Sequence, residues 1–266
     1  MSTGRFAYII FIVLALISSE INAKDELQHP KVMHISGAIS AQALSKVRFD
    51  LIAFRNTDPF PAGLIVLLDS TGGDGDAAMA IGRLLRQHNA HVFVTNRCDS
   101  ACVLVFMGGV VRAANPNALG VHAGRLTMMM GDGKVVREID ASRSLDDSFQ
   151  LAGFNRDVRI YLQEMGIGHG ILDVMLAHPT MQVYKLSSAD MTRYQVTGFE
   201  NRYLNQRIRQ LDKLGYSREL NRVSFFTRTM SVPRLCQAVR NSSVQFVECY
   251  RKILFGIHDS ASLAGT

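Results

Sequence analysis

A serine between two cysteines is the first feature of this sequence that could carry out chemistry. Ser100 lies midway between Cys98 and Cys102, directly after an alternating run that is typical of a β-strand. Residues 101–107 are wholly apolar and end at two glycines, which predicts a short buried helix. A serine at a helix start is commonly an N-cap. It is also where α/β hydrolases expose a nucleophile, because helix N–H groups and the helix dipole point there.

A glycine pair and a histidine make the nucleophile interpretation stronger. Gly72 and Gly73 follow a continuous apolar run that is typical of a strand buried on both faces. Adjacent glycines let backbone N–H groups approach a ligand closely, as an oxyanion hole requires. His122 follows the serine segment at the end of another strand-like run, with glycines nearby that leave space around its ring. Each feature alone has a structural explanation, but their conjunction favours a serine hydrolase.

The elements that must position these residues alternate in type. From residue 31 to about residue 200, strand-like and helix-like segments follow one another with short loops, which predicts an α/β fold with a mainly parallel sheet. Residues 126–139 are typical of a hairpin with Gly-Asp-Gly at its tip. Beyond about residue 200 the chain is polar, basic and mostly helical in pattern.

The order and spacing of these features resemble the ClpP/crotonase superfamily, and within it the Clp-protease-like serine peptidases. The resemblance covers roughly residues 30–200 and is carried by L-D-S-T-G-G-D, C-D-S-A-C, N-P-N-A-L-G-V-H and Y-K-L-S-S-A-D-M-T-R-Y-Q-V-T-G. It implies a spiral of β-β-α units, followed here by a mainly helical C-terminal extension. The export pattern at the N-terminus and the cysteine-flanked serine are most similar to periplasmic ClpP-like proteins.

The resemblance also implies roles for four residues. Ser100 would be the nucleophile, His122 its general base, and the N–H groups of Gly73 and Ala101 the oxyanion hole. The reaction would be hydrolysis of a peptide or protein substrate through an acyl-enzyme. Neither a cofactor nor a metal is expected. Because relatives assemble into rings or trimers, self-association into a homo-oligomer is also implied.

The family's third catalytic residue is an acid just before its F-L-S-A segment, and this sequence lacks it. Gln182 and Val183 occupy that neighbourhood. Asp190 or Asp173 is the candidate substitute. A Ser–Lys mechanism would need Lys134, which we expect at a hairpin tip where solvent keeps it protonated. The missing acid favours an alternative function, a catalytically weak or inactive ClpP-like binding or assembly module.

The first 23 residues are typical of a cleavable signal peptide. A single positive charge precedes the apolar run of residues 6–17, and small residues end at Ala23. The run is shorter than the roughly 20 residues that a membrane span needs, so an uncleaved anchor is the less favoured alternative. The sequence therefore predicts a periplasmic or secreted protein with a ClpP/crotonase-like domain at 24–200 and a basic extension at 201–266.

The four cysteines are expected to form two disulfides in an oxidising compartment. Cys236 with Cys249 is favoured within the C-terminal segment. Cys98 with Cys102 is favoured because an i,i+4 spacing on a helix gives a Cα separation of about 6 Å. Pairing between the two regions is the alternative. The spacings are not those of a zinc site.

The formal net charge of the chain is +6, and much of the excess lies after Arg193. A basic segment of this kind could associate weakly with an anionic membrane surface, although solvated helix faces are the simpler interpretation. The aromatic and basic pattern of a nucleic-acid module does not occur. We therefore expect no nucleic-acid partner.

Overall fold

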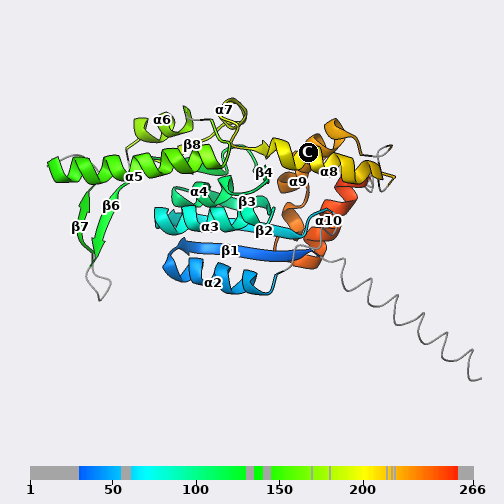
Figure 1. Ribbon diagram of the computed structural model, residues 1–266, viewed down its shortest axis with the longest axis horizontal. Helices are drawn as coiled ribbons and strands as arrows, with labels where there is room; N and C mark the ends of the chain where they lie inside the picture. Colours follow the sequence, from blue (N-terminus) through cyan, green and yellow to red (C-terminus); the bar gives the residue numbers. More distant parts are fainter. Residues whose placement is uncertain are drawn as a thin grey trace, which may run out of the picture.

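The computed structural model describes residues 30–54, 61–129, 135–139 and 145–256, apart from residues 169, 180, 214, 217 and 219. The expected signal peptide and Lys134 lie outside this part of the chain. The strands are β1 Lys31–Ile39, β2 Leu64–Gly73, β3 His91–Asp99, β4 Val111–Ala113, β5 Leu119–Val121, β6 Leu126–Met129, β7 Val135–Ile139, β8 Tyr184–Lys185 and β9 Gly198–Phe199 (Figure 1). The helices are α2 Ala41–Ile52, α3 Gly75–Gln87, α4 Ala101–Met107, α5 Leu145–Glu164, α6 Gly170–Ala177, α7 Ser188–Arg193, α8 Asn201–Lys213, α9 Arg222–Leu235 and α10 Ser243–Phe255. Within these ranges, no helix combines the length and the apolar character that crossing a membrane requires.

The central sheet is parallel over most of its width, which confirms the predicted α/β class. Strands β1, β2, β3 and β4 are parallel neighbours in that order, and β9 adds an antiparallel edge. The beginning of β3 pairs with β4, whereas its last two residues, Cys98 and Asp99, pair with β5. The sheet therefore divides at β3. Because of this division, the end of β3 that leads to Ser100 lies against β5, which leads to His122.

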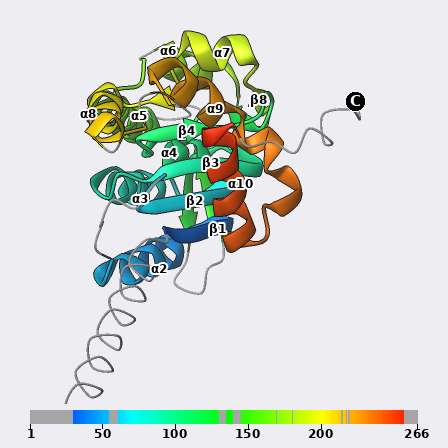
Figure 2. The same ribbon diagram turned by 90° about the vertical axis from the view of Figure 1, so that its right-hand side faces the viewer.

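Both faces of the sheet are covered, as the apolar character of β2 predicts. Leu64, Val66 and Leu68 pack with the helices that precede residue 200 in a first hydrophobic core. Ile65 and Leu67 pack on the other face with the helices that follow it. Figure 2 shows strands β1 to β4 stacked in order, with α10 crossing them. The mainly helical C-terminal segment thus shares a core with the sheet.

Several of the C-terminal arginines hold this segment together. Arg207 is buried, and its guanidinium donates to the carbonyl oxygen of Pro61 at 3.0 Å. Arg228 donates to the carbonyl oxygen of Leu254 at the end of α10. Part of the basic excess that the sequence places after Arg193 is therefore used within the fold.

A buried histidine joins the sheet to the C-terminal helices. His91 begins β3 and has no exposed surface. Its Nε2 lies 2.6 Å from the hydroxyl of Tyr203, and its Nδ1 lies 3.0 Å from the hydroxyl of Tyr250. Burial, with a smaller contribution from the positive charge of Arg207, lowers the pKa of His91 well below its ordinary value of 6.5. The folded protein therefore keeps this imidazole neutral.

Because His91 stays neutral in the folded protein, we expect the protein to lose stability in mild acid. The unfolded chain binds a proton at His91 near pH 6.5 and the folded chain does not, so the unfolded state is favoured as pH falls below that value. We expect the free energy of unfolding to fall by up to about 1.4 kcal/mol for each pH unit. Denaturant unfolding from about pH 7.5 to 5 measures this slope. His91→Gln should have a shallower slope by the same amount, and equal slopes in both proteins would contradict the assignment.

Candidate active site

Ser100 connects β3 to α4 in a backbone conformation that side chains rarely adopt. Its φ is 57° and its ψ is −129°. The backbone N–H of Ser100 donates to the carbonyl oxygen of Gly120 at 2.8 Å, and its own carbonyl oxygen accepts the N–H of Val103 at 3.0 Å. The hydroxyl, by contrast, caps none of the helix N–H groups that the structure describes. The main chain of Ser100 is therefore held by hydrogen bonds on both sides, and its hydroxyl does not act as a cap.

Two disulfides are present, with the pairing favoured by the sequence. Cys98 and Cys102 join the residues on either side of the Ser100 turn, with their Cα atoms 5.2 Å apart. Cys236 and Cys249 join the end of α9 to α10, with their Cα atoms 5.9 Å apart. All four cysteines of the chain are thereby paired. Across the described ranges, no group of three or more His, Cys, Asp and Glu side chains could hold a metal ion.

Both glycines at the end of β2 lie where a Cβ atom would not fit, and a Cβ at Gly73 would overlap the backbone of Ile39. Gly72 has a φ of +101°, and a Cβ atom there would lie only 2.6 Å from the Cβ of Ser100. Its N–H donates to the hydroxyl of Ser70 at 3.0 Å. Gly73 also lines the cavity that contains Ser100. Ala101 lines it too, and as the first residue of α4 it has an N–H without an intrahelical acceptor.

His122 lines the same cavity, one residue beyond the end of β5. Its Nδ1 lies 2.7 Å from the carbonyl oxygen of Ala123. Because a carbonyl oxygen can only accept, Nδ1 carries the proton in this contact, and in the neutral ring Nε2 is then the nitrogen with the free lone pair. Within the described part of the chain, no hydrogen bond joins Ser100 to His122. In many hydrolases this bond tightens only when substrate is in place.

The cavity around these residues has a volume of about 570 Å³ and is lined by both apolar and polar residues. Most of its apolar lining residues come from α5 and α6: Phe154, Val158, Leu172, Met175 and Leu176. The polar lining residues are mainly Asp74, Asp76, Arg125 and Asn155. Burial, followed by the charges of Asp74 and Asp157, raises the pKa of Asp76. Sequence reasoning missed the apolar lining, although the helical spacing within α5 and α6 is its signal.

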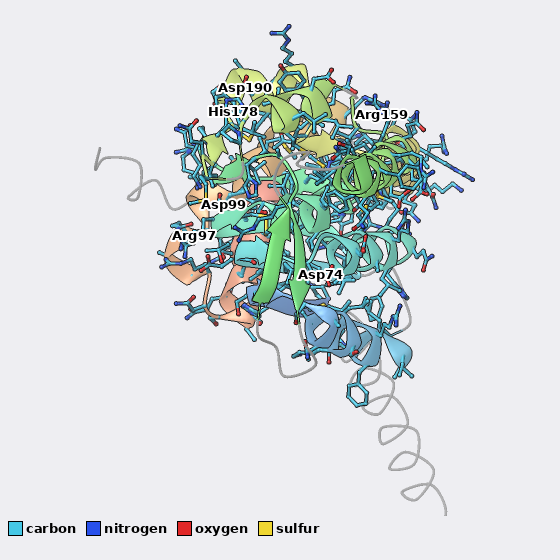
Figure 3. All side chains as sticks on the ribbon, turned by 90° about the vertical axis from the view of Figure 1, so that its left-hand side faces the viewer. Asp74, Arg97, Asp99, Arg159, His178 and Asp190 are labelled. Carbon is cyan, nitrogen blue, oxygen red and sulfur yellow. A yellow bond between two sulfur atoms is a disulfide. The ribbon has the colours of Figure 1, made fainter. Side chains whose placement is uncertain are left out.

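The two candidates for a third catalytic residue do not meet His122. Asp173 and Asp190 line a separate cavity together with His178. Figure 3 shows His178 and Asp190 next to each other, well apart from Asp74, which lines the cavity of Ser100. Neither aspartate is therefore supported as the partner of His122.

Asp190 is instead occupied by a capping box at the start of α7. Its carboxylate accepts from the hydroxyl of Ser187 at 2.7 Å and from the N–H of Ser187 at 2.9 Å, and the phenol of Tyr184 adds a third bond at 3.1 Å. The Ser187 hydroxyl is the main cause of the lowered pKa of Asp190. The carboxylate thus stabilises the helix start.

Comparison with known proteins finds similarity in structure only. No protein-family model matches the chain, and no curated protein matches it. Among solved structures, a mutant of ClpP1 from Listeria monocytogenes is similar with a TM-score of 0.46 and 15% identity, over 65% of this chain and 90% of that one. The membrane-bound stomatin-specific protease 1510-N in complex with a substrate peptide has a TM-score of 0.42 and 21% identity, over 62% of this chain and 72% of that one. Similarity at this level says nothing about the activity of this chain.

Proposed function

We propose that this protein is a serine peptidase in which Ser100 is the nucleophile. The observation that supports this most directly is the conformation of Ser100, whose strained backbone is bonded on both sides while its hydroxyl makes no cap. Strain of this kind persists only where the surroundings enforce it, and it concentrates at functional sites. His122, Gly73 and Ala101 line the same cavity, which supports assigning them the remaining roles of base and oxyanion hole.

Each step of the reaction has a group in the cavity that can perform it. Nε2 of His122 takes the proton of Ser100 as the hydroxyl oxygen attacks the scissile carbonyl. The N–H groups of Gly73 and Ala101 stabilise the resulting oxyanion. His122 then returns the proton to the leaving amine, and a water molecule releases the acyl group by the reverse sequence. The apolar wall of α5 and α6 is suited to an apolar side chain of the substrate.

A binding or assembly module is the second candidate, and one observation favours it. The Nδ1 of His122 donates to a neutral carbonyl oxygen. That contact fixes the tautomer, but it stabilises the protonated ring less than a carboxylate would. A site built this way can bind a peptide while hydrolysing it slowly.

We also propose that the protein is exported and self-associates. Two disulfides are stable in an oxidising compartment, and the N-terminal order of charge, apolar run and small residues fits a cleaved signal peptide. Homo-oligomerisation is proposed from the family resemblance of the sequence.

Covalent labelling of the wild-type protein distinguishes the two functions. A fluorophosphonate reacts with an activated serine, so we expect stoichiometric modification that peptide mapping places on Ser100. Denatured protein should not react, because activation depends on the folded cavity. Folded wild-type protein that stays unmodified and cleaves no peptide or ester would leave the binding module as the function.

A further inference from the structure

An ion pair lies next to the proposed catalytic residues, and the mechanism above does not use it. Asp99 ends β3 directly before Ser100, and Lys185 ends β8. The Nζ of Lys185 lies 2.5 Å from Oδ1 of Asp99. The side chain of Asp99 is only 13% exposed, and that of Lys185 is 40% exposed. This pair is shielded more than a typical surface ion pair, which contributes little.

The ion pair links β3 to β8 across the strand between them, β5, at the position of a glycine. In the sheet, Gly120 of β5 lies opposite Asp99 on one side and opposite Lys185 on the other. Residues directly opposite one another project from the same face of a sheet, so the two charged side chains meet above Gly120. A Cβ atom at Gly120 would overlap the carboxylate of Asp99. Glycine at this position therefore makes room for the ion pair.

The three strands joined in this way carry the nucleophile and the base. Ser100 follows Asp99, and its N–H bonds the carbonyl oxygen of Gly120. His122 lies two residues beyond Gly120. We propose that Lys185 is a positioning residue that, through Asp99, fixes the separation of Ser100 and His122, an inference that rests on the serine peptidase function proposed above.

Lys185 does not act as the base itself. Among the described residues, those that line the cavity of Ser100 include His122 but not Lys185. Its Nζ is bonded to the carboxylate of Asp99. Its effect on catalysis is therefore geometric, and a displacement of about 1 Å in such a site can lower a rate by about a hundredfold.

Variants of Lys185 test this inference through the rate at which a fluorophosphonate labels Ser100. We expect Lys185→Met to lower the limiting labelling rate by about ten- to a hundredfold while the half-saturating reagent concentration stays the same, because the cavity wall is unchanged. Lys185→Arg should restore most of the rate, since a guanidinium can also bond the Asp99 carboxylate. Lys46→Met makes the same exchange in the Lys46–Asp50 pair of α2, whose atoms lie 2.8 Å apart, and should label at the wild-type rate.

A double variant keeps the test decisive if Lys185→Met does not fold. Removing Lys185 alone leaves the largely buried Asp99 carboxylate unpaired, which is costly for stability. Asp99→Asn combined with Lys185→Met removes both charges, and we expect this folded protein still to label slowly. Wild-type rates in either folded variant, or no recovery with Lys185→Arg, would overturn the positioning role. Wild-type protein that never labels would instead remove the serine peptidase function, and the inference with it.

Discussion

Ser100→Ala is expected to abolish fluorophosphonate labelling and peptide hydrolysis while leaving the stability of the protein within about 0.5 kcal/mol of wild type. Labelling and hydrolysis are lost because, in the proposed mechanism, the hydroxyl of Ser100 is the only nucleophile. The small effect on stability follows because the Ser100 hydroxyl caps none of the described helix N–H groups. Alanine meets the same backbone strain as serine at a φ of 57°. Labelling, hydrolysis of an ester or peptide, and denaturant unfolding measure the three quantities.

A serine that does cap a helix provides the matched control. The hydroxyl of Ser242 accepts the N–H of Gln245 at 3.4 Å at the start of α10. Ser242→Ala should lower the free energy of unfolding by about 1 kcal/mol and leave labelling unchanged. If Ser100→Ala shows that same loss of stability while wild-type protein labels nowhere, Ser100 is a structural residue and the nucleophile assignment is wrong.

The parts of the site that could be predicted are those that strand ends bring together. Ser100 and His122 each follow a strand of one sheet, and Gly73 ends a third, so the alternation of elements was enough to expect them in one cavity. The disulfide that brackets Ser100 was predicted correctly, but the expected reason was wrong, because Cys98 lies in β3 and Cys102 in α4, so the two do not share a helix. Such features depend on local spacing, which a single sequence contains.

The parts that could not be predicted depend on pairing between distant segments. Lys185 belongs to a strand of two residues, too short for a period-two pattern, and its contact with Asp99 follows only from the sheet register.

Other features did have a signal in the sequence that was missed. For Asp190 the signal was local, since Ser187 three residues earlier completes a capping box. The continuous apolar sequence of β2 also indicated that further elements pack on the second face of the sheet, and the C-terminal helices do so.

The partner of Nδ1 determines what we expect of His122. His122→Ala should lower the labelling rate and the hydrolysis rate by about 10²- to 10⁴-fold, the usual contribution of a general base. The wild-type rate should itself be modest, because the carbonyl oxygen of Ala123 fixes the tautomer without adding a negative charge beside the protonated ring. Free imidazole in the buffer should restore part of the lost rate to His122→Ala, since it can enter the space that the ring leaves.

His178 offers a control with the same local bonding, because its ring lines a different cavity even though its backbone carbonyl oxygen accepts the N–H of Ala123 at 2.8 Å. Its Nδ1 lies 2.8 Å from the carbonyl oxygen of Val174, but its ring lines the cavity of Asp173 and Asp190. His178→Ala should therefore label at the wild-type rate even if the stacking of His178 on Tyr184 is lost and stability falls. Equal losses of rate in both variants would show that the effect is a general loosening of the fold. A rate that falls only in His122→Ala, and that imidazole partly restores, identifies His122 as the base although its Nδ1 contacts a carbonyl oxygen.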